Sequence, residues 1–195
     1  MYVFILSISD FIICLNKKII PSKREFFENK SQELIKEAKK ENIAILIYGS
    51  PLIATTHISL IQKARKLGIQ VKIIHNASIL DAITETGLQI YKFGKIASMP
   101  IFEADSFIQI IKDNQKINSH TLILVDIDLD LKDALKKLES LNLGKIIICQ
   151  SLGTKNSKIF YDSVNNLKKL RIKKPFCIII PSKLHFIEEK VLEMF

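Results

Sequence analysis

Four of the strand-like apolar runs end in small or polar residues that could line a ligand pocket. These ends fall at residues 49–51, 75–78, 126 and 150–153. Ligands of open α/β sheets bind beyond the carboxyl ends of the strands, where the backbone of small residues can approach a ligand closely. The positions therefore predict a binding cleft, although the residue types alone do not identify its ligand.

Several motifs that would name a ligand are absent from the sequence. There is no Walker A lysine motif and no Gly-x-Gly-x-x-Gly, which disfavours a nucleoside triphosphatase or a Rossmann dehydrogenase. Neither Cys-x-x-Cys nor His-Glu-x-x-His occurs, and the spacing of the four histidines supports no metal site. Of these, His57 is interpreted as a cover for a helix start or a substrate contact, and His75 as structural. Asp126 is interpreted as a turn or cap residue.

The cysteines and the N-terminal segment bear on where the protein resides. Cys14, Cys149 and Cys177 lie far apart, each in an apolar run, which is typical of reduced, buried thiols. The apolar segment 1–15 has no basic start, is interrupted by Asp10, and is shorter than the roughly 20 residues that span a bilayer. We expect a cytoplasmic protein whose N-terminus forms one or two buried strands.

The chain is basic, with a net charge of +9, but only three of its 29 basic residues are arginines. Lysine is a point charge and lacks the bidentate fork that reads guanine. A basic surface can attract RNA or another polyanion, but it is more often only solvated. A dedicated nucleic-acid function is therefore not expected.

The elements that must position these residues alternate between strands and helices. This alternation predicts an α/β fold built from β-α-β units with right-handed crossovers. Hydrophobic periodicity predicts strands over residues 43–48, 70–75, 121–127, 145–149 and 176–180, and helices over 23–40, 56–67, 78–86, 106–116, 131–138, 164–170 and 184–195. Pro100 interrupts the pattern, so two small α/β domains are expected. They are residues 1–98, with a shortened parallel sheet, and residues 99–195, with a mixed sheet.

One long block resembles a known enzyme family. Residues 49–95, GSPLIATTHISLIQKARKLGIQVKIIHNASILDAITETGLQIYKFGK, resemble the central block of the diphthine synthases, which belong to the tetrapyrrole methylase superfamily. The family shows Gly-Asp-Pro, a hydrophobic pair and Ala-Thr-Thr-His here, and later Gly-Leu-Gln-x-Tyr-x-Phe-Gly. HTLILVDI (120–127) and IIIPSKLHFIEE (178–189) resemble two downstream motifs of the family.

The resemblance implies a fold, a cofactor and a reaction. It implies two α/β domains with S-adenosyl-L-methionine (SAM) in the cleft between them, in a homodimer. The implied substrate is translation elongation factor 2, whose modified histidine carries a 3-amino-3-carboxypropyl group. Methylation of that amino group gives diphthine and S-adenosyl-L-homocysteine.

The resemblance also implies which residues bind the cofactor. They are Ile8, Ser50, Ile53, Ser78, Ile79, Val125, Leu152 and His185. The apolar members could sandwich the adenine and the methionine chain, and backbone groups at Ser78 and Ile79 could hold polar edges. No catalytic base is expected, because SAM carries an activated leaving group and the protein mainly aligns the reactants and excludes water.

The sequence departs from the family pattern at two places. Ser50 replaces the aspartate of Gly-Asp-Pro, and residues 6–9 replace a glycine-rich loop. These departures leave open the alternative that the chain is a non-catalytic homologue. The net charge of +9 leaves open a second alternative, an RNA methyltransferase of the same superfamily.

Overall fold

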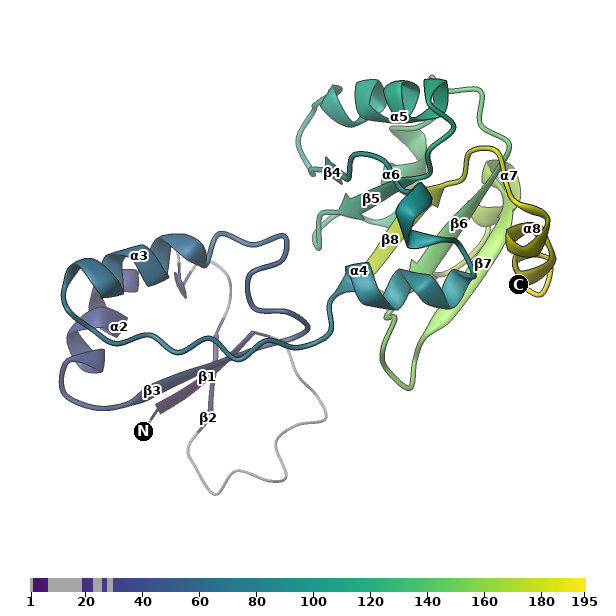
Figure 1. Ribbon diagram of the computed structural model, residues 1–195. Helices are drawn as coiled ribbons and strands as arrows, with labels where there is room; N and C mark the ends of the chain where they lie inside the picture. Colours follow the sequence, from purple (N-terminus) through teal and green to yellow (C-terminus); the bar gives the residue numbers. More distant parts are fainter. Residues whose placement is uncertain (1, 7–18, 23–25, 28–29) are drawn as a thin grey trace. The chain divides into compact units, whose positions relative to one another are not determined.

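The computed structural model describes residues 2–6, 19–22, 26–27 and 30–195 (Figure 1). It divides into two compact units, residues 1–79 and residues 80–195. The sequence places the division later, near Pro100. Residues 80–98 join the second unit because the strand β4 (Ala97–Met99) pairs with β5 (Thr121–Val125), and because the backbone of Phe93 bridges to His120.

The first unit contains a small parallel sheet in the order β2-β1-β3. Its strands are β1 (Tyr2–Leu6), β2 (Ile19–Pro21) and β3 (Ile43–Ile47), and β1 pairs with both neighbours. The helices α2 (Ser31–Ala38) and α3 (Ile58–Lys66) accompany this sheet. Phe27 and Leu34 form the buried centre of the unit, and Ile43, Ile45 and Leu60 pack against them.

The helix α3 ends as the sequence predicts, whereas the strand expected after it does not form. Gly68 has φ +73° just beyond the helix, a conformation that glycine adopts without a steric penalty. The structure assigns no strand to residues 70–75, all of which are described. Val71 and Ile73 are half-buried between the exposed Lys72 and Ile74. The apolar alternation therefore reports which side chains face inward, and it does not require a partner strand.

The second unit contains a mixed sheet in the order β4-β5-β8-β6-β7. The strand β4 is parallel to β5, and the other neighbours pair antiparallel. The remaining strands are β6 (Lys145–Gln150), β7 (Lys158–Ser163) and β8 (Phe176–Ile180). Sequence periodicity missed β4 and β7. The strand β4 has only three residues, and β7 is an edge strand whose residues are at most half-buried.

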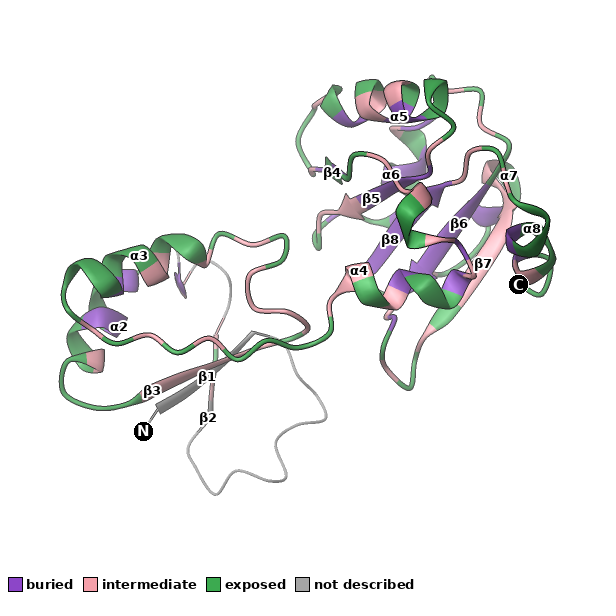
Figure 2. Cartoon of the chain, in the orientation of Figure 1, coloured by how far each residue is buried: buried purple, intermediate pink, exposed green. Residues whose placement is uncertain are grey.

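The centre of this sheet is buried on both faces, as the continuous purple of β6 and β8 shows in Figure 2. Both strands are continuous apolar runs, the pattern expected of a strand that is covered on both sides. Side chains from α5 (Ser106–Lys116), α6 (Leu131–Lys136) and α7 (Val164–Leu167) join Ile146, Ile148 and Ile178 in the main core. The helix α4 (Ile79–Ala82), the 3-10 turn Ile83–Thr86 and the helix α8 (Phe186–Leu192) complete the second unit. The predicted α/β fold class is confirmed.

Cys149 and Cys177 are free, buried thiols that lie opposite each other on β6 and β8. The hydrogen bond with Cys177 and burial both raise the pKa of the Cys149 thiol, so this sulfur is held in its unreactive protonated form. Cys14 lies outside the described residues. Across the part of the chain that the structure describes, no helix has the length and apolarity needed to cross a bilayer.

Candidate functional site

The residues that the resemblance assigns to the cofactor fall into two groups. Ser50, Ile53, Ser78 and Ile79 belong to the first unit, and the second unit holds Val125, Leu152 and His185. Ile8 lies outside the described residues.

In the first unit, the loop after β3 carries Ser50 and Ile53. Gly49 starts the loop with φ +78°, which sends the backbone sharply away from the strand. The amide of Ile53 donates to the carbonyl of Ser50 at 3.4 Å, and Ala54 takes a left-handed conformation with φ 53°. Ser50 is half-buried in this turn, while the side chain of Ile53 is 39% exposed. The loop therefore presents an apolar side chain next to a small hydroxyl.

The segment that carries Ser78 lies beside this loop. A Cβ atom built on Gly49 would stand 3.7 Å from the carbonyl oxygen of Ala77, so the two backbones are in near contact. Asn76 stabilises its own turn, because its Oδ1 accepts from the amide of Ala77 at 2.9 Å. The structure thus brings the two predicted cofactor segments of the first unit together, although 27 residues separate Ser50 from Ser78.

In the second unit, strand register decides which predicted residues are neighbours. Leu124 of β5 pairs with Cys177, and Gln150 of β6 pairs with Phe176 at the start of β8. Val125 ends β5 and Leu152 follows β6. Because both strands are antiparallel to β8, the two residues lie at the end of the sheet where β8 begins. The amide of Ser151 donates to the carbonyl of Pro175 at 2.9 Å, which fixes the turn that holds Leu152 against that edge.

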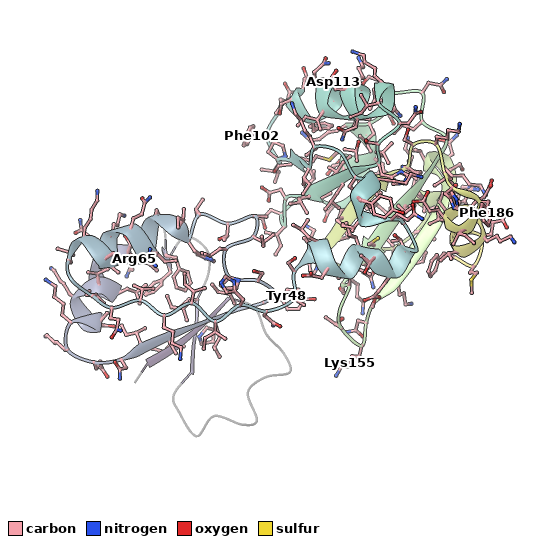
Figure 3. The ribbon with its side chains drawn as sticks, in the orientation of Figure 1. Tyr48, Arg65, Phe102, Asp113, Lys155 and Phe186 are labelled. Carbon is pink, nitrogen blue, oxygen red and sulfur yellow. The ribbon has the colours of Figure 1, made fainter. Side chains whose placement is uncertain are left out.

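The same register places His185 at the other end of β8. Thr121, the first residue of β5, pairs with Ile180, the last residue of β8, and His185 follows from there. Phe102 follows β4, at the same end of the sheet as Val125, and Phe186 is next to His185. The two phenylalanines lie on opposite sides of the unit (Figure 3). His185 therefore lies at the opposite end of β8 from Val125 and Leu152, and its assignment to the cofactor stays a prediction from the resemblance. The sequence motif gave its position along the chain but not the direction of β8.

The structure gives His185 a local role as the N-cap of α8. Its Nδ1 accepts from the amide of Ile187 at 3.3 Å, and the carboxylate of Glu188 accepts from the amide of His185 at 2.7 Å. Together these bonds form a capping box, which satisfies amides that a helix start leaves without partners.

Phe176 lies at the start of β8, at the opposite end of the strand from His185. It opens β8, pairs with Gln150 and is 7% exposed. Phe176 belongs to the main core, and nothing in the run FCIII distinguishes it from the core residues that follow.

Asp126 acts as the turn residue that its position predicts. Its Oδ1 accepts from the amide of Asp128 at 3.0 Å, and its own amide donates to the carbonyl of Met99 at 2.9 Å. The carboxylate is thereby used in local structure. Within the described residues, no group of three or more His, Cys, Asp or Glu side chains could hold a metal ion.

A buried polar cluster connects the two downstream motifs of the sequence. Glu188 is fully buried and accepts from the amide of Gln89 at 3.0 Å and from Nε2 of His120 at 3.2 Å. Lys92 also bonds to the Glu188 carboxylate and donates to the carbonyl of Lys183 at 2.9 Å. The cluster ties residues 87–94 to the start of α8, so these motif residues serve to hold the unit together.

Electrostatics in this cluster follow from its hydrogen bonds. Burial alone raises the pKa of Glu188, but the amides of Gln89 and His185, with Lys92 and His120, lower it to about 2. Burial lowers the pKa of His120, against the opposing effect of its bond to Glu188. The cluster therefore holds an ionised carboxylate beside a neutral imidazole at neutral pH.

Comparison with known proteins gives the chain its family. The family described as Tetrapyrrole (Corrin/Porphyrin) Methylases matches residues 13–168. A diphthine synthase of Methanococcus maripaludis is 39% identical over 200 residues, which cover 92% of this chain and 78% of that protein. A diphthine methyl ester synthase of Candida albicans is 42% identical over 135 residues, covering 67% of this chain and 44% of that one. The crystal structure of a diphthine synthase matches with a TM-score of 0.81 and 30% identity, covering 92% of this chain and 75% of that one.

The α/β architecture and the family match over most of the chain define its class, and the protein belongs to the tetrapyrrole methylase family. Within that family it belongs with the diphthine synthases, to which it is similar over 92% of its length. The resemblance carried by residues 49–95 is thereby confirmed.

Proposed function

We propose that this protein is a SAM-dependent methyltransferase of diphthamide biosynthesis. Its substrate would be the 3-amino-3-carboxypropyl-histidine of elongation factor 2, methylated on the amino group to give diphthine. The observation that carries the proposal is the 39% identity to a diphthine synthase along 92% of the chain. The cytoplasmic location and the homodimer remain predictions from the sequence.

The residues present fit such a cofactor. In the first unit, Ile53 and Ile79 offer apolar side chains, and Ser50 and Ser78 offer small polar groups in the same two loops. In the second unit, Val125 and Leu152 offer apolar side chains. Gly153, next to Leu152, has φ +76°, and a Cβ atom placed there would meet nothing within 4 Å, so there is space beside this backbone. His185 stays the eighth residue that the resemblance assigns to the cofactor.

SAM supplies a methyl group on a positively charged sulfur that leaves readily. What the protein must add is alignment of the acceptor nitrogen with the methyl carbon and exclusion of water. In the first unit, local hydrogen bonds hold the neighbouring loops at residues 49–55 and 76–79. In the second unit, Val125 and Leu152 are held by neighbouring strands. Rigid positioning of this kind lowers the entropic cost of reaching the reactive geometry.

The direct test is methyl transfer to elongation factor 2 that carries the precursor histidine. Incubation with SAM labelled in its methyl group should place label on the factor, and mass spectrometry should count the methyl groups. The count matters because the relatives include both a diphthine synthase and a diphthine methyl ester synthase. Cofactor binding without any label on the factor would contradict the proposed substrate.

A second candidate is a non-catalytic binding protein, and Ser50 is the observation that favours it. Calorimetry separates the two, since micromolar SAM binding argues against loss of the site. The RNA methyltransferase alternative rests only on the net charge of +9. It requires RNA binding that weakens steeply with salt, because each neutralised phosphate releases counterions.

A further inference from the structure

The imidazole of His57 closes the loop that carries Ser50 and Ile53. Its Nδ1 lies 3.1 Å from the carbonyl oxygen of Pro51 and 2.8 Å from Oγ1 of Thr55. A carbonyl oxygen has no proton to give, so Nδ1 must carry a proton and donate it to Pro51. The Thr55 hydroxyl then accepts from the same N–H group. The ring thus connects the beginning of the loop to its end.

His57 is itself anchored at two other points. Its carbonyl oxygen accepts from the amides of Leu60 and Ile61 at 3.1 and 3.2 Å, which fixes it to the first turn of α3. Its ring meets the ring of Phe27 edge-on, with 5.9 Å between centroids. Phe27 is 4% exposed and belongs to the core of the unit. His57, whose ring hydrogen-bonds to the loop, is therefore held in place by α3 and by the core of the first unit.

The loop needs such support, because its own residues do not favour its conformation. Ala54 has φ 53°, a left-handed conformation that is unfavourable for a residue with a Cβ atom. The bond from the amide of Ile53 to Ser50 is long, at 3.4 Å. The hydrogen bonds of His57 offset this strain.

We propose that His57 is a positioning residue, which holds residues 50–55 in the conformation that binds the cofactor. This inference rests on the proposed function. A ligand that binds only one conformation of a loop loses affinity in proportion to the fraction of molecules in other conformations. His57 therefore acts on cofactor affinity through Ser50 and Ile53.

The test measures the dissociation constant of S-adenosylhomocysteine by calorimetry in matched variants. His57→Ala should weaken binding about five- to tenfold, the effect expected when a hydrogen bond worth ~1–1.5 kcal/mol is lost. His57→Asn should restore binding to within about twofold of the wild type, because its side-chain amide can donate from nearly the same position as Nδ1. Thr55→Val removes one of the two contacts and should weaken binding about twofold.

Ser59→Ala is the matched control. It removes a side-chain hydrogen bond of 3.0 Å to the carbonyl of Thr56, at the same helix start, without touching Pro51 or Thr55. The control should bind like the wild type. Melting temperatures of the ligand-free variants distinguish positioning from general stability, since a merely structural role would lower the melting temperature and leave the affinity of the folded protein unchanged.

The outcomes separate this inference from the function on which it rests. If the wild type binds S-adenosylhomocysteine and His57→Ala binds it equally well, the positioning role is wrong and the function stands. Equal weakening in His57→Asn and His57→Ala also overturns the role of the Nδ1 donor. If the wild type does not bind the ligand, the proposed function and this inference both fall.

Discussion

His120 donates a hydrogen bond to Glu188 in the interior of the second unit, with 3.2 Å between Nε2 and Oε1 and neither side chain exposed. The tautomer follows from the other ring nitrogen. The amide of Ser182 donates to Nδ1 at 2.9 Å, so Nδ1 carries no proton and Nε2 does. One neutral imidazole thereby joins β5, the turn after β8 and the start of α8.

Replacement of this carboxylate should destabilise the second unit. Glu188→Gln removes the negative charge beside Lys92. It also turns a side-chain NH2 group toward groups that donate hydrogen bonds to the carboxylate. Breaking a buried ion pair costs about 3–5 kcal/mol, and we expect about 3 kcal/mol because the Lys92 side chain is 22% exposed and can partly reach water. Urea denaturation measures the loss. Glu189→Gln, on an exposed neighbour, is the control and should change stability by less than about 0.5 kcal/mol.

Stability should fall in acid in two stages. The pKa of His120 is lowered by burial from 6.5, so its contribution is present above pH 6.5 and is lost as the pH falls through the folded-state pKa. The pKa of Glu188 falls from 4.5 to about 2 through its hydrogen bonds, although burial opposes them, so its contribution is lost between pH 4.5 and 2. Unfolding free energies measured from pH 8 to 3 should decline through both ranges. His120→Gln should remove the upper decline, and a profile unchanged by it would contradict the assignment.

Two glycines provide a test of local geometry. Gly87 has φ +79°, and a Cβ atom there would overlap Cγ1 of Val191. Gly87→Ala should therefore cost about 2–4 kcal/mol, from left-handed strain and overpacking together. Gly144→Ala meets nothing within 4 Å and should be nearly neutral. Thermal unfolding of both variants checks the difference, and equal melting temperatures would contradict the packing of α8 against Gly87.

If His185 acts only as the N-cap of α8, His185→Ala should affect stability but not cofactor affinity. Loss of the N-cap of α8 costs about 0.5–2 kcal/mol, since the amide of Ile187 loses its acceptor. The dissociation constant of S-adenosylhomocysteine should stay within about twofold of the wild-type value, whereas Leu152→Ala should raise it. A large loss of affinity in His185→Ala would show that the cofactor contacts His185, as the resemblance implies.

An acidic residue at position 50 should strengthen SAM binding. The family pattern has an aspartate where this chain has Ser50, and a carboxylate could contact the positively charged cofactor. A charged hydrogen bond that is partly shielded from water contributes ~1.5–3 kcal/mol, so Ser50→Asp should tighten binding by a few-fold to about a hundredfold. Ser59→Asp adds the same charge at the exposed start of α3 and serves as the control. Weaker binding in Ser50→Asp would show that the site has repacked around serine.

Local pattern predicted most of the second unit. The helix expected over residues 106–116 coincides with α5, and the strand expected over 176–180 coincides with β8. The helix has strong periodicity, and the strand is a continuous apolar run bounded by Pro175 and Pro181. The strand expected over residues 70–75 failed, because a half-buried extended segment has the same alternation as a strand whether or not it is paired.

The sequence predicted where candidate site residues lie along the chain, but not which of them the sheet brings together. Ser50 and Ser78 follow strand-like runs, and the backbones of their two loops are in near contact, although residues 70–75 form no strand. The direction of β8 was not accessible, because an apolar run reads the same for a parallel and an antiparallel strand. That single unknown decides whether Phe176 or His185 is the neighbour of Leu152.

The place of β8 in its sheet has a consequence for synthesis on the ribosome. The strand is the last of its unit in sequence, yet it lies between β5 and β6 and supplies pairing to both. Until residues 176–180 leave the exit tunnel, the nascent chain holds only the separate pairs β4–β5 and β6–β7. Such unpaired apolar edges invite aggregation. A chaperone that shields these edges during translation would therefore benefit the second unit until β8 has been made.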